Sequence, residues 1–223
     1  MVPIRTALLT ALVILGLRGI AVGEPVPVSP SDLAKCEKGF GALQQSTRTF
    51  SADIVQTLFL QGLAQPIVSR GALFYAAPDR LLIRFSQPAG EWMLVHGAQS
   101  AVKKQGKPLE LRDLSSSNSK SSHAANLLDF FRSGPDHWHR DFDVSMTQEG
   151  DQVLVHLKPW MTPTTTFQGV ESIITTLQLP SYELVSMEIT LSGSNRVSYE
   201  FSHPRRNLDL APSLFDLPKD AAP

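Results

Sequence analysis

Apolar and polar residues alternate along much of the chain from residue 50 onward, a pattern that predicts short β-strands. In the first such segment Phe50, Ala52 and Ile54 fall on one face. Turn-forming Pro, Gly, Asn and Asp residues separate the segments, so we predict an antiparallel meander. The further predicted strands span residues 69–75, 81–86, 92–96, 142–146, 153–157, 170–179, 184–191 and 196–202.

A different periodicity precedes the strands. Within residues 31–50, apolar side chains such as Leu33, Cys36 and Phe40 recur at spacings of three and four, which predicts an amphipathic helix of about four turns. The proline-rich residues 24–30 are expected to form an extended lead-in. A second, shorter apolar helix is predicted at residues 126–131, after a serine-rich loop at 115–122.

The first 23 residues have the layout of a secretory signal peptide. Arg5 supplies the positive charge, residues 7–17 form an apolar run, and residues 21–23 are small. The run is too short for a membrane span, which needs about 20 apolar residues. We therefore expect export to the periplasm, with an uncleaved signal that tethers the chain as the alternative.

Composition narrows the classes of function. The chain has 20 Lys and Arg against 21 Asp and Glu, and only 18% of its residues are charged. This balance gives no sign of nucleic-acid binding, which a strongly basic chain would show. A single cysteine, Cys36, excludes an intramolecular disulfide and a multi-thiolate zinc site. Its place on the helix stripe predicts a buried, unreactive thiol.

Several predicted strands are apolar on both faces, notably at residues 81–83, 93–95 and 153–155. A meander with one face in water should alternate more cleanly. The pattern therefore indicates either helices that cover one side or a sheet curved around an apolar cavity. A filled sandwich core explains it equally well.

No motif for catalysis is found among the common nucleophile, phosphate-loop, dinucleotide and zinc-protease patterns. His137 and His139 could share a metal if they lay on a strand, but Gly134-Pro135 predicts a polar loop there. Asp141 and Asp143 alternate as on a solvated strand face. We therefore expect no enzyme, no metal and no cofactor.

Short motifs occur in a characteristic order along the chain. The first three are Phe-x-Ala-x-aliphatic-x-Gln at residues 50–56, Gly-x-aliphatic-aromatic at 71–74 and Pro-x-Arg at 78–80. An apolar strand that follows Pro and Gly at 87–95 and Leu-x-Pro at 157–159 come next. The last is a C-terminal motif formed by Asn207, Leu210, Phe215 and Pro218. Over residues 31–218 this order resembles the periplasmic outer-membrane lipoprotein carrier (LolA-type) family.

The resemblance implies an incomplete, strongly curved antiparallel β-barrel with helices that cover an apolar cavity. Members of that family receive lipoprotein acyl chains from an inner-membrane transporter and pass them to an outer-membrane acceptor. The chain departs from the family at Ala77, where carriers usually have an arginine that closes the lid. Arg80 is our candidate for part of that role, as a lid or headgroup contact. We expect the cargo to be a lipoprotein or another lipid.

We expect the side chains on one face of the predicted strands to line the cavity or contact the lid. An error of one residue in a strand's register would place the opposite set of side chains on that face. The candidates are Leu73, Tyr75, Leu81, Ile83, Phe85, Trp92, Leu94, Met187, Ile189, Val197, Tyr199 and Phe201. We expect a monomeric carrier. The alternative is an envelope module that senses acyl chains and regulates a partner protein without transport.

Overall fold

The computed structural model describes residues 25–114, 123–132, 134–160 and 169–217, which form one antiparallel sheet with helices on it. The predicted signal peptide and serine-rich loop lie outside these residues. The described strands are β1 Val26–Pro27, β2 Thr49–Phe59, β3 Ile67–Ala76, β4 Arg80–Gln87, β5 Trp92–His96, β6 Gln99–Lys103, β7 Glu110–Asp113, β8 Phe142–Glu149, β9 Gln152–Pro159, β10 Val170–Gln178, β11 Glu183–Leu191 and β12 Asn195–Arg206. The helices are α1 Pro30–Ser46, α2 His123–Arg132, α3 Pro135–Asp141 and the 3-10 helix η1 Pro212–Phe215.

The sheet is continuous but not closed. Its twelve described strands follow the order β1-β8-β9-β10-β11-β12-β2-β3-β4-β5-β6-β7, so β1 and β7 are the two edges. The central pairing is between β12 and β2, where Phe201 lies opposite Ile54. This open antiparallel barrel confirms the predicted fold class. The predicted lead-in contributes the edge strand β1, which pairs with β8.

Local signals explain where the helices begin and end. Ser29 caps α1 by accepting a hydrogen bond on Oγ from the Asp32 amide, at 3.2 Å. The helix ends at Ser46, earlier than predicted, because the chain turns extended at Thr47 and Phe50 already belongs to β2. No described helix is both long and apolar enough to cross a membrane.

Helix α3 corrects the polar loop predicted around His137 and His139, and it includes Asp141, which was expected on a strand with Asp143. Proline at the first turn of a helix is tolerated, because that position has no intrahelical partner for its missing N–H. Pro135 occupies this position, so the Gly134-Pro135 pair starts a helix and does not only end the preceding one. Trp138 is buried to 2% exposure, which anchors the short helix.

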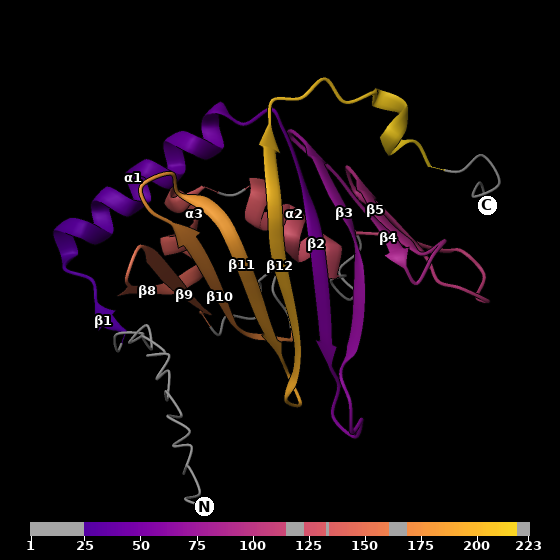
Figure 1. Ribbon diagram of the computed structural model, residues 1–223, viewed down its shortest axis with the longest axis horizontal. Coiled ribbons are helices and arrows are strands. Elements are labelled where there is room, and N and C mark those ends of the chain that lie inside the picture. The colour runs from indigo at the N-terminus through magenta and orange to yellow at the C-terminus, as the bar shows by residue number, and fades with distance from the viewer. Residues whose placement is uncertain (1–24, 115–122, 133, 161–168, 218–223) are drawn as a thin grey trace, which may run out of the picture.

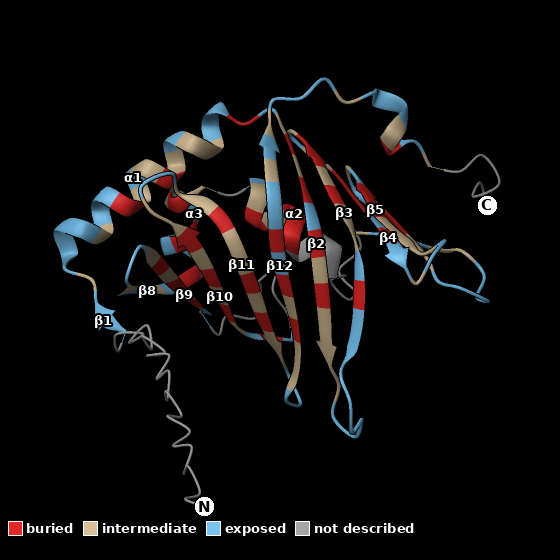
Figure 2. Ribbon diagram, viewed as in Figure 1, coloured by how far each residue is buried: buried red, intermediate tan, exposed pale blue. Residues whose placement is uncertain are grey.

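Two hydrophobic clusters lie on opposite faces of the sheet. We call inner the face that carries Leu73, Ile83 and Met187, all buried in the larger cluster together with side chains of α2 and α3. Figure 1 shows α2 and α3 behind the sheet and α1 across its upper end. Buried positions alternate along β2, β11 and β12 in Figure 2, as half-buried strands require.

The smaller cluster lies on the outer face of β3 to β6 and is covered by η1. Phe215 is 1% exposed and packs with Ala76, Leu82, Leu94 and Ala101. The backbone oxygen of Phe215 lies 3.2 Å from His96 Nδ1. This cover explains why residues 81–83 and 93–95 are apolar on both faces. Their inner side chains pack in the larger cluster with the helices, and their outer side chains pack under the C-terminal segment.

We predict that Phe215→Ala lowers the free energy of unfolding by about 3 kcal/mol, because it removes a fully buried aromatic ring. Urea unfolding measures the change. Leu208→Ala is the control in the same segment; Leu208 is 39% exposed, and we expect a change within about 0.5 kcal/mol. Equal effects of the two substitutions would contradict the anchoring role.

Candidate functional site

The structure places most of the predicted cavity residues together on the inner face. They belong to one buried cluster that spans β3, β4, β11 and β12. Its predicted members are Leu73, Tyr75, Leu81, Ile83, Phe85, Met187, Ile189, Val197, Tyr199 and Phe201. Contact between these residues and a ligand stays a prediction.

Trp92 and Leu94 are corrected to the outer face, where they pack in the cluster under Phe215. In β5 the inner positions are Met93 and Val95, opposite Ile83 and Leu81 of β4. Residues 92–95 are all apolar, so the sequence carried no alternation to set the phase of this strand.

Arg80 also differs from its predicted position. It shares the outer parity of Leu82 in β4, and its guanidinium lies 5.5 Å from the centre of the Phe215 ring. Such a stacked cation adds to the fixation of the C-terminal segment. Arg80 does not contact the helices on the inner face through any interaction found among the described residues.

An aromatic cluster joins the three α-helices. The ring centre of Phe40 in α1 lies 5.3 Å from that of Trp138 in α3 and 5.6 Å from that of Phe130 in α2. Phe130 and Trp138 are 6.0 Å apart. We call α2 and α3 the lid helices, because this cluster holds them between α1 and the inner face of the sheet.

Phe131 fixes α2 to the sheet directly. Its ring centre lies 5.2 Å from that of Phe50 in β2 and 5.2 Å from that of Tyr75 in β3. Aromatic pairs at such distances contribute about 0.5–1.5 kcal/mol beyond the burial of their area. Sequence reasoning found a short apolar helix here but missed its role; the paired aromatics Phe130 and Phe131 were the available signal.

Two polar contacts also connect α1 to the lid helices. Gln44 Nε2 donates a hydrogen bond to the Phe130 carbonyl at 3.0 Å. His139 Nε2 lies 2.6 Å from Glu37 Oε1. The Gln44 bond is partly buried beside the core residue Phe130, whereas His139 is exposed at the surface of α3. Water can therefore replace the His139–Glu37 contact when the helices separate.

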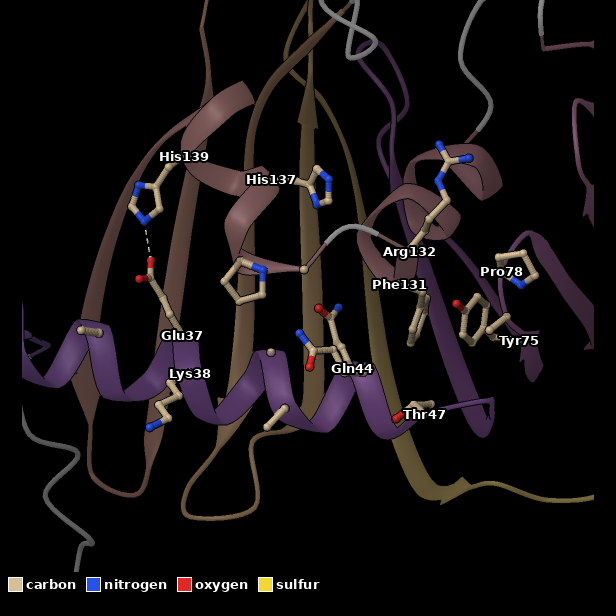
Figure 3. A pocket seen from close by; sticks show the side chains of 17 residues that line it. Glu37, Lys38, Gln44, Thr47, Tyr75, Pro78, Phe131, Arg132, His137 and His139 are labelled. Carbon is tan, nitrogen blue, oxygen red and sulfur yellow. Dashed lines mark hydrogen bonds and ion pairs between the residues drawn. The ribbon is translucent and has the colours of Figure 1, made fainter.

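A cavity of about 800 Å³ lies where α1 faces the lid helices, at the rim of the sheet (Figure 3). We call it the rim cavity. Its lining mixes apolar groups, including Tyr75 and Phe131, with polar ones such as Gln44 and Arg132. Ala77 also lines it. The position where the family resemblance implies an arginine therefore borders open space.

Both histidines of α3 line the rim cavity, and His139 also contacts Glu37, which lines it as well. Among the described residues no group of three or more His, Cys, Asp or Glu side chains is arranged to hold a metal. Asp141 accepts hydrogen bonds from Arg140, which lower the pKa of that carboxyl.

The single cysteine, Cys36, is buried and packs in the hydrophobic core. Cys36 is 4% exposed on the inner stripe of α1, and burial raises its pKa to about 11. At neutral pH it is therefore protonated, whereas a nucleophilic cysteine must be a thiolate.

Helix α1 is also held at its middle by a close approach to the β10–β11 turn. A Cβ at Gly39 would lie 2.1 Å from Tyr182 Cε2, so only glycine fits against this ring. A Cβ at Gly41 would meet the Pro135 ring at 3.4 Å, an ordinary van der Waals contact. A side chain is therefore excluded at Gly39 by the Tyr182 ring, whereas the space at Gly41 admits one.

Comparisons with known proteins identify the relationship. The family model described as "Outer membrane lipoprotein carrier protein LolA" matches residues 45–218. No curated protein matches the chain in sequence. Among solved structures, an uncharacterized conserved protein from Thermus thermophilus has a TM-score of 0.50 at 9% identity, covering 85% of this chain and 96% of that chain. That likeness concerns the fold alone.

Two further solved structures are similar at lower scores. A LolA superfamily protein from Nitrosomonas europaea has a TM-score of 0.45 at 10% identity and covers 82% of this chain and 97% of that chain. The lipoprotein LppX from Mycobacterium tuberculosis has a TM-score of 0.45 at 12% identity and covers 82% of this chain and 100% of that chain.

We predict opposite effects for alanine at the two glycines of α1. Gly39→Ala should lower the free energy of unfolding by about 1–3 kcal/mol through the clash with Tyr182. Gly41→Ala should raise it by about 0.5–1 kcal/mol through helix propensity. Chemical denaturation measures both. In the background of Tyr182→Ala the penalty at Gly39 should disappear; if it persists, the close approach is not its cause.

Proposed function

The chain belongs to the outer membrane lipoprotein carrier (LolA) family, and on that basis we propose that it binds the acyl chains of a lipoprotein or other lipid on the inner face of its sheet. It would act in the periplasm, as the predicted signal peptide implies. It would receive its cargo from an inner-membrane transporter and deliver it to an outer-membrane acceptor.

The observation that supports this proposal most directly is the apolar inner face under the lid helices. Buried side chains from β2 to β5 and from β8 to β12 form one cluster with Leu127, Leu128 and Phe130 of α2. An acyl chain could replace the lid side chains against this surface without exposing the sheet to water. The lid helices and the ligand would then compete for the same apolar area.

This competition suits a carrier. Each CH₂ group moved out of water contributes about 0.8 kcal/mol, so even a partly buried acyl chain is held firmly. Displacing the aromatic contacts of Phe40, Phe130 and Phe131 offsets part of that gain. The net affinity stays moderate, and the cargo can pass to an acceptor that binds it more tightly. The protein would perform no chemistry on its cargo.

The proposal is tested by native mass spectrometry of the protein purified from its own envelope fraction. A co-purifying acylated species supports carriage and reveals its mass. The same protein should bind a fluorescent fatty-acid probe and release it when unlabelled fatty acid is added. A ligand-free mass together with no binding of the probe would contradict the proposal.

We predict that Phe131→Ala tightens binding of the fatty-acid probe about tenfold, because the closed position of α2 loses contacts worth about 1.4 kcal/mol. Phe131 contacts Phe50 and Tyr75, and these contacts must break when α2 moves. Fluorescence titration measures the change.

Phe74→Ala is the matched control for this substitution. Phe74 is a partly buried phenylalanine that packs in the outer cluster, so its removal should leave probe affinity unchanged. Weaker or unchanged binding by Phe131→Ala would contradict the competition between ligand and lid helices.

A further inference from the structure

One row of residues across the inner face carries polar groups, whereas the face around it is mostly apolar. The row is defined by strand register: Thr175 of β10 lies opposite Met187 of β11, which lies opposite Tyr199 of β12. Tyr199 lies opposite Gln56 of β2, and Gln56 lies opposite Ser69 of β3. We call this row the polar row; four of its five residues are polar, and Met187 is apolar.

The polar row is buried. Thr175 and Tyr199 are 0% exposed, and Gln56 and Ser69 are no more than 9% exposed. The neighbouring inner positions along the same strands are apolar, among them Ile173 and Leu177 in β10 and Val197 and Phe201 in β12. The polar groups therefore lie at one level of the apolar surface.

The hydrogen bonds of the row are incomplete. Gln56 Nε2 donates to the Tyr199 hydroxyl at 2.8 Å, but no described residue accepts the proton of that hydroxyl. Thr175 Oγ1 has no hydrogen-bond partner of any kind among the described residues. Burial also raises the pKa of Tyr199, so its hydroxyl remains a donor at neutral pH.

A buried hydroxyl without a partner lowers stability, and valine would fill the place of Thr175 without that penalty. Packing therefore gives no reason for a threonine at this position. A ligand that brings a hydrogen-bond acceptor to this level of the inner face would give one. The acceptor that every ester-linked or amide-linked acyl chain carries is its carbonyl oxygen.

We propose that the polar row binds the carbonyl group of a bound acyl ester or amide, with Thr175 as the principal donor and Tyr199 as the second. This assignment rests on the proposed function of acyl-chain binding. It specifies the ligand class as carbonyl-linked acyl chains, as distinct from plain hydrocarbon or ether-linked chains. It also fixes how far along the inner face the acyl linkage lies, since the row runs across the strands at one level.

The Gln56–Tyr199 bond has a defined part in this arrangement. By donating to the tyrosine oxygen, Gln56 occupies the acceptor side of that hydroxyl and leaves its proton for the ligand. Gln56 is thus a positioning residue, and it is also the glutamine that closes the Phe-x-Ala-x-aliphatic-x-Gln motif.

The test compares two probes that differ only at the linkage, methyl palmitate and hexadecyl methyl ether, in competition with a fluorescent apolar dye. We expect the wild-type protein to bind the ester about tenfold more tightly than the ether, the factor that one well-formed buried hydrogen bond contributes. Thr175→Val should remove most of this preference and leave the affinity for the ether unchanged. Tyr199→Phe should reduce it in part.

Thr176→Val is the matched control. Thr176 is the next residue of β10, its side chain faces outward, and its Oγ1 accepts a hydrogen bond from Ser186 Oγ at 2.9 Å. It should leave the ester preference intact. Thermal unfolding should show Thr175→Val to be at least as stable as the wild type, so a lost preference cannot come from misfolding.

Equal binding of ester and ether by the wild type would overturn the assignment of the polar row while the carrier function stands. An ester preference that survives Thr175→Val would do the same. If neither compound displaces the dye, acyl-chain binding itself is contradicted, and so is the proposed role of the polar row.

Discussion

The burial of the lid helices against the inner face is the interaction on which the rest of the structure depends. A curved sheet that does not close has one large apolar surface that must be kept from water. Here the cover comes from Leu127, Leu128 and Phe130 of α2 and from Trp138 of α3, and α1 holds both helices in place through Phe40. Because the lid helices are not strands of the sheet, they can move away from the inner face while the sheet stays folded. Reversible binding of apolar chains requires such a movement.

The two faces of the sheet are covered in different ways. On the outer face, Phe215 and Arg80 fix the C-terminal segment over the sheet. On the inner face, the contacts of α1 with the lid helices border the rim cavity, where Ala77 leaves space. The rim cavity thus lies on the side that we assign to the ligand.

The sequence predicted nine of the twelve described strands, β2 to β5 and β8 to β12; it missed β6 and β7 and gave β1 only as an extended lead-in. It also predicted the inner face of β3, β4, β11 and β12, where apolar side chains recur at every second position. It failed at β5, where residues 92–95 are all apolar and the covering residue, Phe215, lies far away in the chain. It also failed at α3, since Gly-Pro marks both the end of one element and the first turn of the next. The polar row could not be predicted, because it exists only when residues of five strands are aligned by their register.

The pairing of β12 with β2 also has a consequence for how the chain folds during synthesis. Phe59 of β2 meets Arg196 of β12, so one side of β2 has no partner until almost the entire chain has been made. Contacts between residues so distant in sequence form slowly, because a long loop must close before they stabilise anything. Until then the unpaired edge and the apolar side chains of β2 are open to aggregation, so we expect this chain to depend on a holding chaperone between synthesis and its final fold.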